Sequence, residues 1–227
     1  IANNMANVNT HAYKRSVAHF QDMLYQTLST PGSGTATAEK PVGIQIGSGV
    51  RTVSISKNLT QGNLESSSSA LDVAIEGQGF FEVEMPDGRS AYTRSGSFHL
   101  NSSGDVVTAN GYRVVGFPRI GTDATGIDIA RDGSVSVTVD GTTKQVGRIG
   151  LVRFANPEGL HSVGSSLYGE SNASGSPRIG KPGESGYGTV AQSFLETSNV
   201  DIVREMVDMI ASQRAYELSS KSVKTAD

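Results

Sequence analysis

Short runs of alternating apolar residues, separated by glycine-containing turns, fill residues 71–180 and constrain the fold more than any other feature of this chain. The clearest alternations are Leu71, Val73, Ile75 and Val135, Val137, Val139. A period of two places every second side chain on the same face of a strand. Asp132-Gly133 and Asp140-Gly141 flank the second run, and Asp-Gly is typical of hairpin turns. Residues 71–180 therefore predict a small antiparallel β barrel or sandwich.

A regular apolar stripe predicts a helix over residues 199–227. Its members, spaced mostly three and four apart, are Ile202, Val203, Met206, Met209, Ile210 and Tyr216. That spacing puts them along one side of a helix. Ser198 is expected to cap this helix, with Asp201 as the acid of a capping box.

The first 28 residues predict a helix end, a turn and a second helix. Four of the first ten residues are Asn, which favours helix ends and turns over helix interiors. Phe20, Leu24 and Leu28 then lie at i, i+4 and i+8, the spacing of one helical face. Residues 1–28 are therefore expected to be an N-terminal helical segment.

Two segments rich in small polar residues are expected to be linkers, residues 29–70 and residues 181–198. Within the first, residues 29–40 are rich in Ser, Thr, Gly and Pro, and we expect them to be disordered in the free monomer. The fold class is then mainly β with terminal α-helices. Those helices could pair as an antiparallel, coiled-coil-like core and leave apolar surface for other subunits. Packing of both helices on the β domain is the alternative, and periodicity alone does not decide between them.

Composition excludes several classes of function. The net charge is −3 with both signs scattered along the chain, so no basic block is present to bind nucleic acid. No apolar run approaches the roughly 20 residues of a membrane span, and no cleavable signal peptide is visible. Cysteine is absent, which excludes disulfides and thiolate metal sites.

The sequence contains no pattern typical of a catalytic, cofactor or metal site. Its histidines, none at the spacing of a helical metal pair, are His11, His19, His99 and His161. Gly77-Gln78-Gly79 lacks the third glycine of a dinucleotide loop, and Phe80-Phe81 would block a phosphate. We expect both phenylalanines to lie in the core, and the aspartates that precede glycine to form turns.

Three segments resemble one known family in order and spacing. They include Asn3-Asn4-Met5-Ala6-Asn7 with Ala12-Tyr13-Lys14-Arg15; Leu71-Asp72-Val73-Ala74-Ile75-Glu76-Gly77-Gln78-Gly79-Phe80-Phe81 with Tyr92-Thr93-Arg94-Ser95-Gly96; and Glu196-Thr197-Ser198-Asn199-Val200-Asp201 with Gln213-Arg214-Ala215-Tyr216-Glu217. The chain resembles the flagellar axial proteins of rod and hook. The stretch 25–51 is similar to an extra segment of the distal-rod branch.

The resemblance implies a structural subunit without catalysis or cofactor. It implies assembly with copies of itself into a rigid helical tube that transmits motor torque to the hook, with the stripe on 199–227 and Phe20, Leu24 and Leu28 at the interface. Implied partners are other rod and hook subunits, the P- and L-ring bushing proteins and the flagellar export apparatus. The implied location is the basal body, crossing the periplasm to the outer membrane after export without a cleaved signal peptide. Family members are longer, so we expect both terminal helices to be incomplete here.

Three alternative functions are weaker. Another axial subunit, of the proximal rod or hook, would lack the stretch 26–50. A cell-wall hydrolase would need paired carboxylates or a metal site, and no such cluster is apparent. A carbohydrate-binding β module would expose aromatic platforms, yet several of the seven Tyr and seven Phe fall inside strand patterns.

Overall fold

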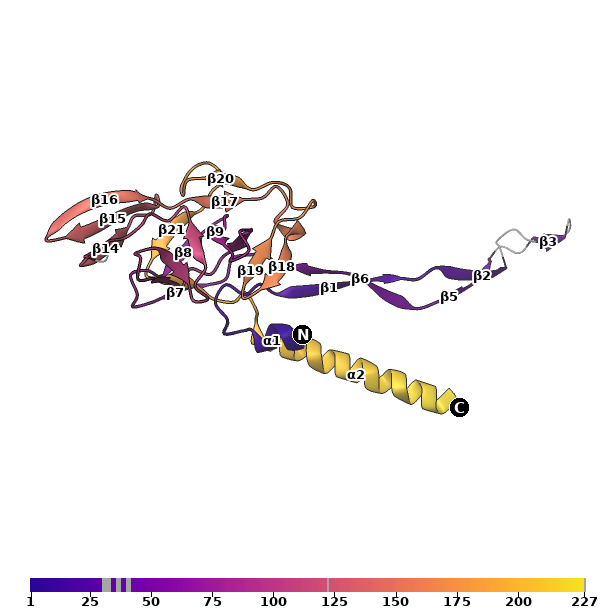
Figure 1. Cartoon of the computed structure of the whole chain (residues 1–227). Coiled ribbons are helices and arrows are strands. Elements are labelled where there is room, and N and C mark those ends of the chain that lie inside the picture. Colours follow the sequence, from indigo (N-terminus) through magenta and orange to yellow (C-terminus); the bar gives the residue numbers. More distant parts are fainter. Residues whose placement is uncertain (30–33, 36–37, 40–41, 122, 227) are drawn as a thin grey trace. The chain divides into compact units, whose positions relative to one another are not determined.

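The computed structural model describes residues 1–29, 34–35, 38–39, 42–121 and 123–226. They form two compact units (Figure 1). The first combines Ile1–Arg15 with Leu59–Asp227, and the second is Ser16–Asn58. The expected disorder of residues 29–40 stays a prediction, because most of that range lies outside the described residues.

The first unit contains both α-helices, α1 (Ala2–Ala6) and α2 (Ile202–Ala226), and a 3-10 turn at Pro157–Gly159. The predicted C-terminal helix is confirmed, but its expected cap is wrong. Asp201 Oδ1 accepts the backbone N–H groups of Val203 at 2.9 Å and Arg204 at 3.2 Å. Ser198 lies too early, because Thr197 is still hydrogen-bonded to the β framework through Asn63. The helix therefore starts with Asp201 as its N-cap.

The largest sheet is antiparallel and has seven strands in the order β11-β12-β13-β9-β10-β19-β18. Their bounds are β9 Phe81–Glu84, β10 Ser90–Thr93, β11 Phe98–Leu100, β12 Val106–Thr108, β13 Arg113–Val115, β18 His161–Gly164 and β19 Leu167–Gly169. The sheet is open, with β11 and β18 at its edges. Of the predicted barrel or sandwich, the barrel is therefore wrong, and the sheet instead packs against smaller sheets.

A three-stranded meander and three strand pairs make up the rest of the first unit. The meander is β14 (Gly126–Ile129), β15 (Ser134–Val139) and β16 (Thr142–Arg148), and its turns contain the two predicted Asp-Gly pairs. The pairs are β8 (Val73–Glu76) with β21 (Thr189–Gln192), β7 (Leu64–Ser66) with β22 (Phe194–Glu196), and β17 (Leu151–Arg153) with β20 (Arg178–Gly180). Residues 181–198, expected to be a linker, therefore supply two strands of the framework.

The core lies on both faces of the large sheet. Phe81 and Val83 of β9 pack in one apolar cluster with Val73 and Phe98. Phe80 packs in a second cluster, which also contains Tyr92, Val152, Phe154, Leu160 and Tyr168. Successive side chains of an extended segment point to opposite faces, so the two neighbouring phenylalanines enter different clusters. Both are buried, as predicted.

The second cluster predicts a loss of stability at alkaline pH. Burial raises the pKa of Tyr92 and of Tyr168 from 10.0 to about 12. Because the folded pKa is the higher one, this contribution to stability is complete below pH 10.0 and is lost as the pH rises towards 12. We expect the free energy of unfolding, measured in urea at several pH values, to fall in that window. The double variant Tyr92→Phe/Tyr168→Phe should flatten the fall, and an unchanged slope would contradict the assignment.

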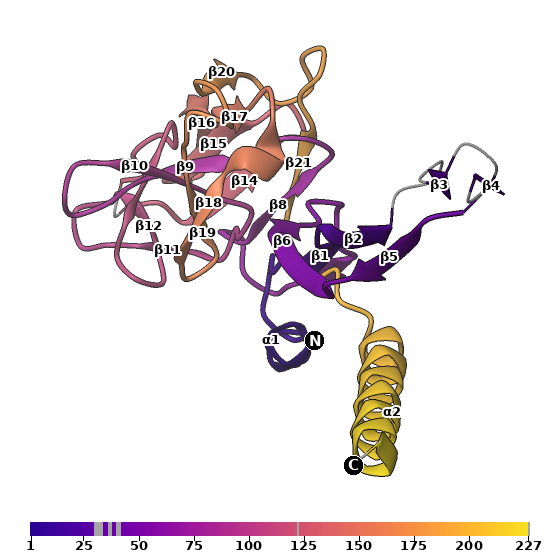
Figure 2. The ribbon, with the colours of Figure 1, turned by 90° about the vertical axis from the view of Figure 1, so that its right-hand side faces the viewer.

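The second unit is an antiparallel ribbon. It consists of β1 (Ser16–Asp22) with β6 (Val50–Lys57), β2 (Tyr25–Ser29) with β5 (Ile44–Gly47), and β3 (Gly34–Thr35) with β4 (Ala38–Glu39). Figure 2 shows the two strands of each of the first two pairs side by side. The predicted helix through Phe20, Leu24 and Leu28 is wrong. A spacing of four residues is also a multiple of the two-residue strand period, so it does not distinguish the two structures.

Candidate assembly interface

The stripe predicted on the C-terminal helix is exposed to solvent. Of its six residues, Ile202, Val203, Met206, Ile210 and Tyr216 are exposed and Met209 is half-buried. Val203 is 70% exposed and Tyr216 is 78% exposed. Burying one large apolar side chain is worth about 1.5–3 kcal/mol. The helix thus carries apolar surface that the described chain does not cover.

This apolar surface is too wide for a single partner helix. Val207, Leu218 and Val223 of α2 are exposed as well. At 3.6 residues per turn, the apolar residues from Ile202 to Val223 span an arc of about 220°. A helix packed on one partner needs a stripe of roughly 100°. The apolar arc is therefore about twice as wide as the stripe that packs on one partner helix.

The N-terminal segment covers one edge of this arc. Ile1, Met209 and Tyr216 line a common shallow cavity. Because α1 has only five residues, the described contact is not a coiled coil. Pairing of longer terminal helices stays a prediction.

Polar contacts join the N-terminal segment to the first turns of α2. Glu205 Oε1 accepts hydrogen bonds from Asn4 Nδ2 at 3.2 Å and from Arg15 Nε at 2.5 Å, and Arg15 Nη2 contacts Asp208 Oδ2 at 3.2 Å. Burial alone would raise the pKa of Glu205, but the hydrogen bonds from Arg15 and Asn4 outweigh it and lower the pKa. These contacts fix the start of α2 while the apolar side chains beyond it stay exposed.

The ribbon exposes the remaining predicted interface residues. Phe20, Leu24 and Leu28 are all exposed, Leu24 at 92%. Further exposed apolar side chains of the same ribbon are Ile44, Ile46, Val50, Val53 and Ile55. A two-stranded ribbon has no second layer in which to bury such residues. Its apolar surface is typical of a segment that other chains cover.

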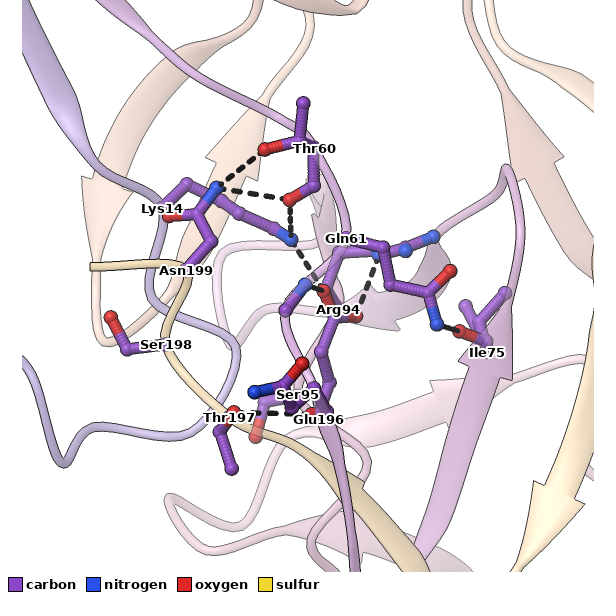
Figure 3. Close-up of polar contacts among 12 residues, drawn as sticks. Lys14, Thr60, Gln61, Ile75, Arg94, Ser95, Glu196, Thr197, Ser198 and Asn199 are labelled. Atoms are coloured by element: carbon purple, nitrogen blue, oxygen red, sulfur yellow. Dashed lines mark hydrogen bonds and ion pairs between the residues drawn. The ribbon is translucent and has the colours of Figure 1, made fainter. Parts of the chain in front are cut away.

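Three buried charges meet in one group, which we call the charge cluster: Lys14, Arg94 and Glu196 (Figure 3). Glu196 Oε1 accepts hydrogen bonds from Lys14 Nζ and from the backbone N–H of Gly62, the latter at 2.9 Å. Glu196 Oε2 accepts from Arg94 Nε at 3.0 Å. The cluster thereby ties together segments as far apart in the sequence as Lys14 and Glu196.

Both cations of the cluster also bind backbone carbonyls. Lys14 Nζ donates to Thr60 O at 2.7 Å. Arg94 Nη1 donates to Gly77 O at 2.7 Å and to Gly79 O at 2.8 Å. Burial is the largest influence on Lys14 and lowers its pKa, against the opposing effect of Glu196. Buried charges of this kind are retained only where charged and hydrogen-bonded partners are complete.

Sequence reasoning did not identify the charge cluster. Lys14, Arg94 and Glu196 each lie in a different one of the three segments that resemble the family. No spacing rule connects residues that are 182 positions apart, as Lys14 and Glu196 are. One residue beside the cluster does indicate close packing in the sequence, and it is a glycine. At Gly62, an added Cβ atom would lie 2.1 Å from the carbonyl oxygen of Thr197.

The acidic residues assigned to turns have that role. Asp87 Oδ1 accepts the backbone N–H of Arg89 at 3.1 Å, and Asp132 Oδ1 accepts that of Ser134 at 3.0 Å. Within the described part of the chain, no group of three or more His, Asp or Glu side chains could hold a metal ion. Over the same residues, no helix combines the length and apolar character needed to cross a bilayer.

Comparison with known proteins gives two family matches. Residues 74–137 match the family described as flagellar hook protein FlgE/F/G D1 domain. Residues 191–227 match the family described as flagellar basal body rod FlgEFG protein C-terminal.

Full-length similarity extends these matches. The chain is 47% identical to the flagellar basal-body rod protein FlgG of Buchnera aphidicola subsp. Acyrthosiphon pisum. It is 45% identical to FlgG of Agrobacterium fabrum and 40% identical to FlgG of Bacillus subtilis. Each alignment covers 100% of this chain and 88% of the relative. The chain therefore belongs to the flagellar basal-body rod protein FlgG family and is a structural subunit of the flagellar distal rod.

Proposed function

We propose that this subunit polymerises with copies of itself into a rigid helical tube that transmits motor torque to the hook. The observation that carries this proposal is the apolar arc of about 220° on α2, most of which is exposed. One edge faces the N-terminal segment, and the rest requires neighbouring subunits. A single heterologous contact, repeated without closing into a ring, generates a helical filament.

The ribbon Ser16–Asn58 is proposed to stiffen that tube. Its exposed apolar residues, among them Phe20, Leu24 and Leu28, would be covered by neighbouring subunits. Ordering a ribbon against its neighbours costs conformational entropy once, at assembly. Afterwards, sliding one subunit past another requires these apolar contacts to break. This resistance to shear is the physical basis proposed for a straight shaft.

We further propose partners and a location from the family. The subunit would contact other rod and hook subunits at the ends of its segment, and the P- and L-ring proteins around its outer surface. It would reach the periplasm through the flagellar export apparatus without a cleaved signal peptide and extend to the outer membrane. A net charge of only −3 is compatible with a shaft that turns inside a ring without strong electrostatic attraction.

Self-association tests the proposed function directly. The purified chain is concentrated, and its products are examined by sedimentation and electron microscopy. A straight tubular polymer is expected. A curved, bendable filament would favour the hook alternative, and a chain that stays monomeric at high concentration would contradict the proposal.

A further inference from the structure

A cavity of about 440 Å³ opens onto the charge cluster. Lys14 and Arg94 line it, together with Gln61, Phe80 and the loop 77–79. None of its lining residues is Asp or Glu. Glu196 is fully buried and lies outside the lining. Lys14 is fully buried as well, so a group that enters the cavity meets Arg94 and not the carboxylate partner of Arg94.

Arg94 retains donor capacity toward this cavity. Its Nε and Nη1 are bonded to Glu196 Oε2 and to the carbonyls of Gly77 and Gly79. Its other terminal nitrogen, Nη2, has no hydrogen-bond partner among the residues that the structure describes. The Phe80 ring, 6.0 Å from Arg94 Cζ, packs against the guanidinium. Arg94 is only 5% exposed, so these contacts hold its free donor in a fixed position.

Two cations, Lys14 and Arg94, lie around one carboxylate, that of Glu196. Cations in a buried, poorly solvated site are stabilised by an anion that comes near them. An anion that enters the cavity would accept the free N–H groups of Arg94.

We propose that the cavity binds a carboxylate side chain presented by a second copy of the chain, with Arg94 Nη2 as the donor. This rests on the proposed function, since polymerisation is what brings another copy to the cavity. A carboxylate offers two oxygens that can accept N–H groups of a guanidinium. Each copy offers exposed carboxylates without an ion pair in its described residues, among them Glu65, Asp128, Asp140, Glu158 and Glu170.

The test uses Gln78→Glu, which places a negative charge at the cavity. Gln78 lines the cavity and is exposed, so the change leaves the buried contacts intact. The new carboxylate should repel or replace the incoming one, and we expect the critical concentration for polymerisation to rise about tenfold or more. Gln145→Glu, on the exposed edge strand β16, is the matched control for net charge and should polymerise like the parent chain.

A second measurement uses monomer and a small probe. Sodium acetate is titrated against sodium chloride at equal ionic strength, and the amide resonances of Gly77 and Gly79 are followed. Saturable shifts with acetate, absent in Gln78→Glu, are expected. Equal critical concentrations for the two Glu variants would overturn the proposal while leaving polymerisation intact. If the parent chain never polymerises, the proposed function fails by itself. In that case the acetate titration tests the carboxylate site separately. Saturable shifts would support the site, and their absence would overturn it.

Discussion

Replacing Glu196 with alanine should lower the free energy of unfolding by about 3–5 kcal/mol, because it leaves two buried cations without their anion. Lys14 and Arg94 are 0% and 5% exposed, so solvent compensates little for the lost carboxylate. The free energy of unfolding of a typical domain is only about 5–15 kcal/mol, so Glu196→Ala removes a large fraction of it. Urea unfolding followed by circular dichroism measures the change.

A surface ion pair provides the matched control. Lys181 Nζ lies 3.8 Å from Glu184 Oε1, and both side chains are more than half exposed. Glu184→Ala should cost less than about 1 kcal/mol. In a Glu196→Gln background, Lys14→Met should recover part of the loss, because it removes one of the stranded charges. Equal losses at Glu184 and Glu196, or no recovery, would show that the cluster does not stabilise the fold as described.

Local patterns were sufficient to predict the β domain and the long helix. The alternation of Val135, Val137 and Val139 between two Asp-Gly turns is a property of neighbouring residues, and it reappears as β15 with a hairpin at each end. The stripe from Ile202 to Tyr216 is local in the same sense. Such signals act through the backbone period, so they need no knowledge of distant partners.

Features that depend on distant pairing were not predictable. β1 was expected to be helical because its partner β6 begins 28 residues after β1 ends, at Val50. The glycines and serines of residues 181–198 predict a linker, although two strands, β21 and β22, lie there. Their partners, β8 and β7, are more than 100 residues earlier in the chain. The charge cluster joins Lys14 to Glu196 over a similar separation. In each case the deciding interaction is tertiary, and it overrides local propensity.

Polymerisation should be lost when the outward part of the α2 arc becomes charged. Val203 and Val207 are 70% and 59% exposed and lie on the same side of the helix, away from the edge near Ile1. The double variant Val203→Asp/Val207→Asp removes two apolar contacts of about 1.5–3 kcal/mol each from every interface. Since about 1.4 kcal/mol is a tenfold change, the critical concentration should rise at least about a hundredfold. Sedimentation across a concentration series measures it.

The opposite side of the same helix supplies the control. Ala215 and Ser219 are exposed and have the same four-residue spacing, but they lie outside the apolar arc. Ala215→Asp/Ser219→Asp adds the same charge to α2 and should polymerise at nearly the parent concentration. Circular dichroism of both monomers should show that the helix survives, because the side chains of Val203 and Val207 are mostly exposed in the free subunit. If both variants lost assembly equally, net charge rather than apolar burial would control polymerisation. If neither did, α2 would not be the surface through which subunits meet.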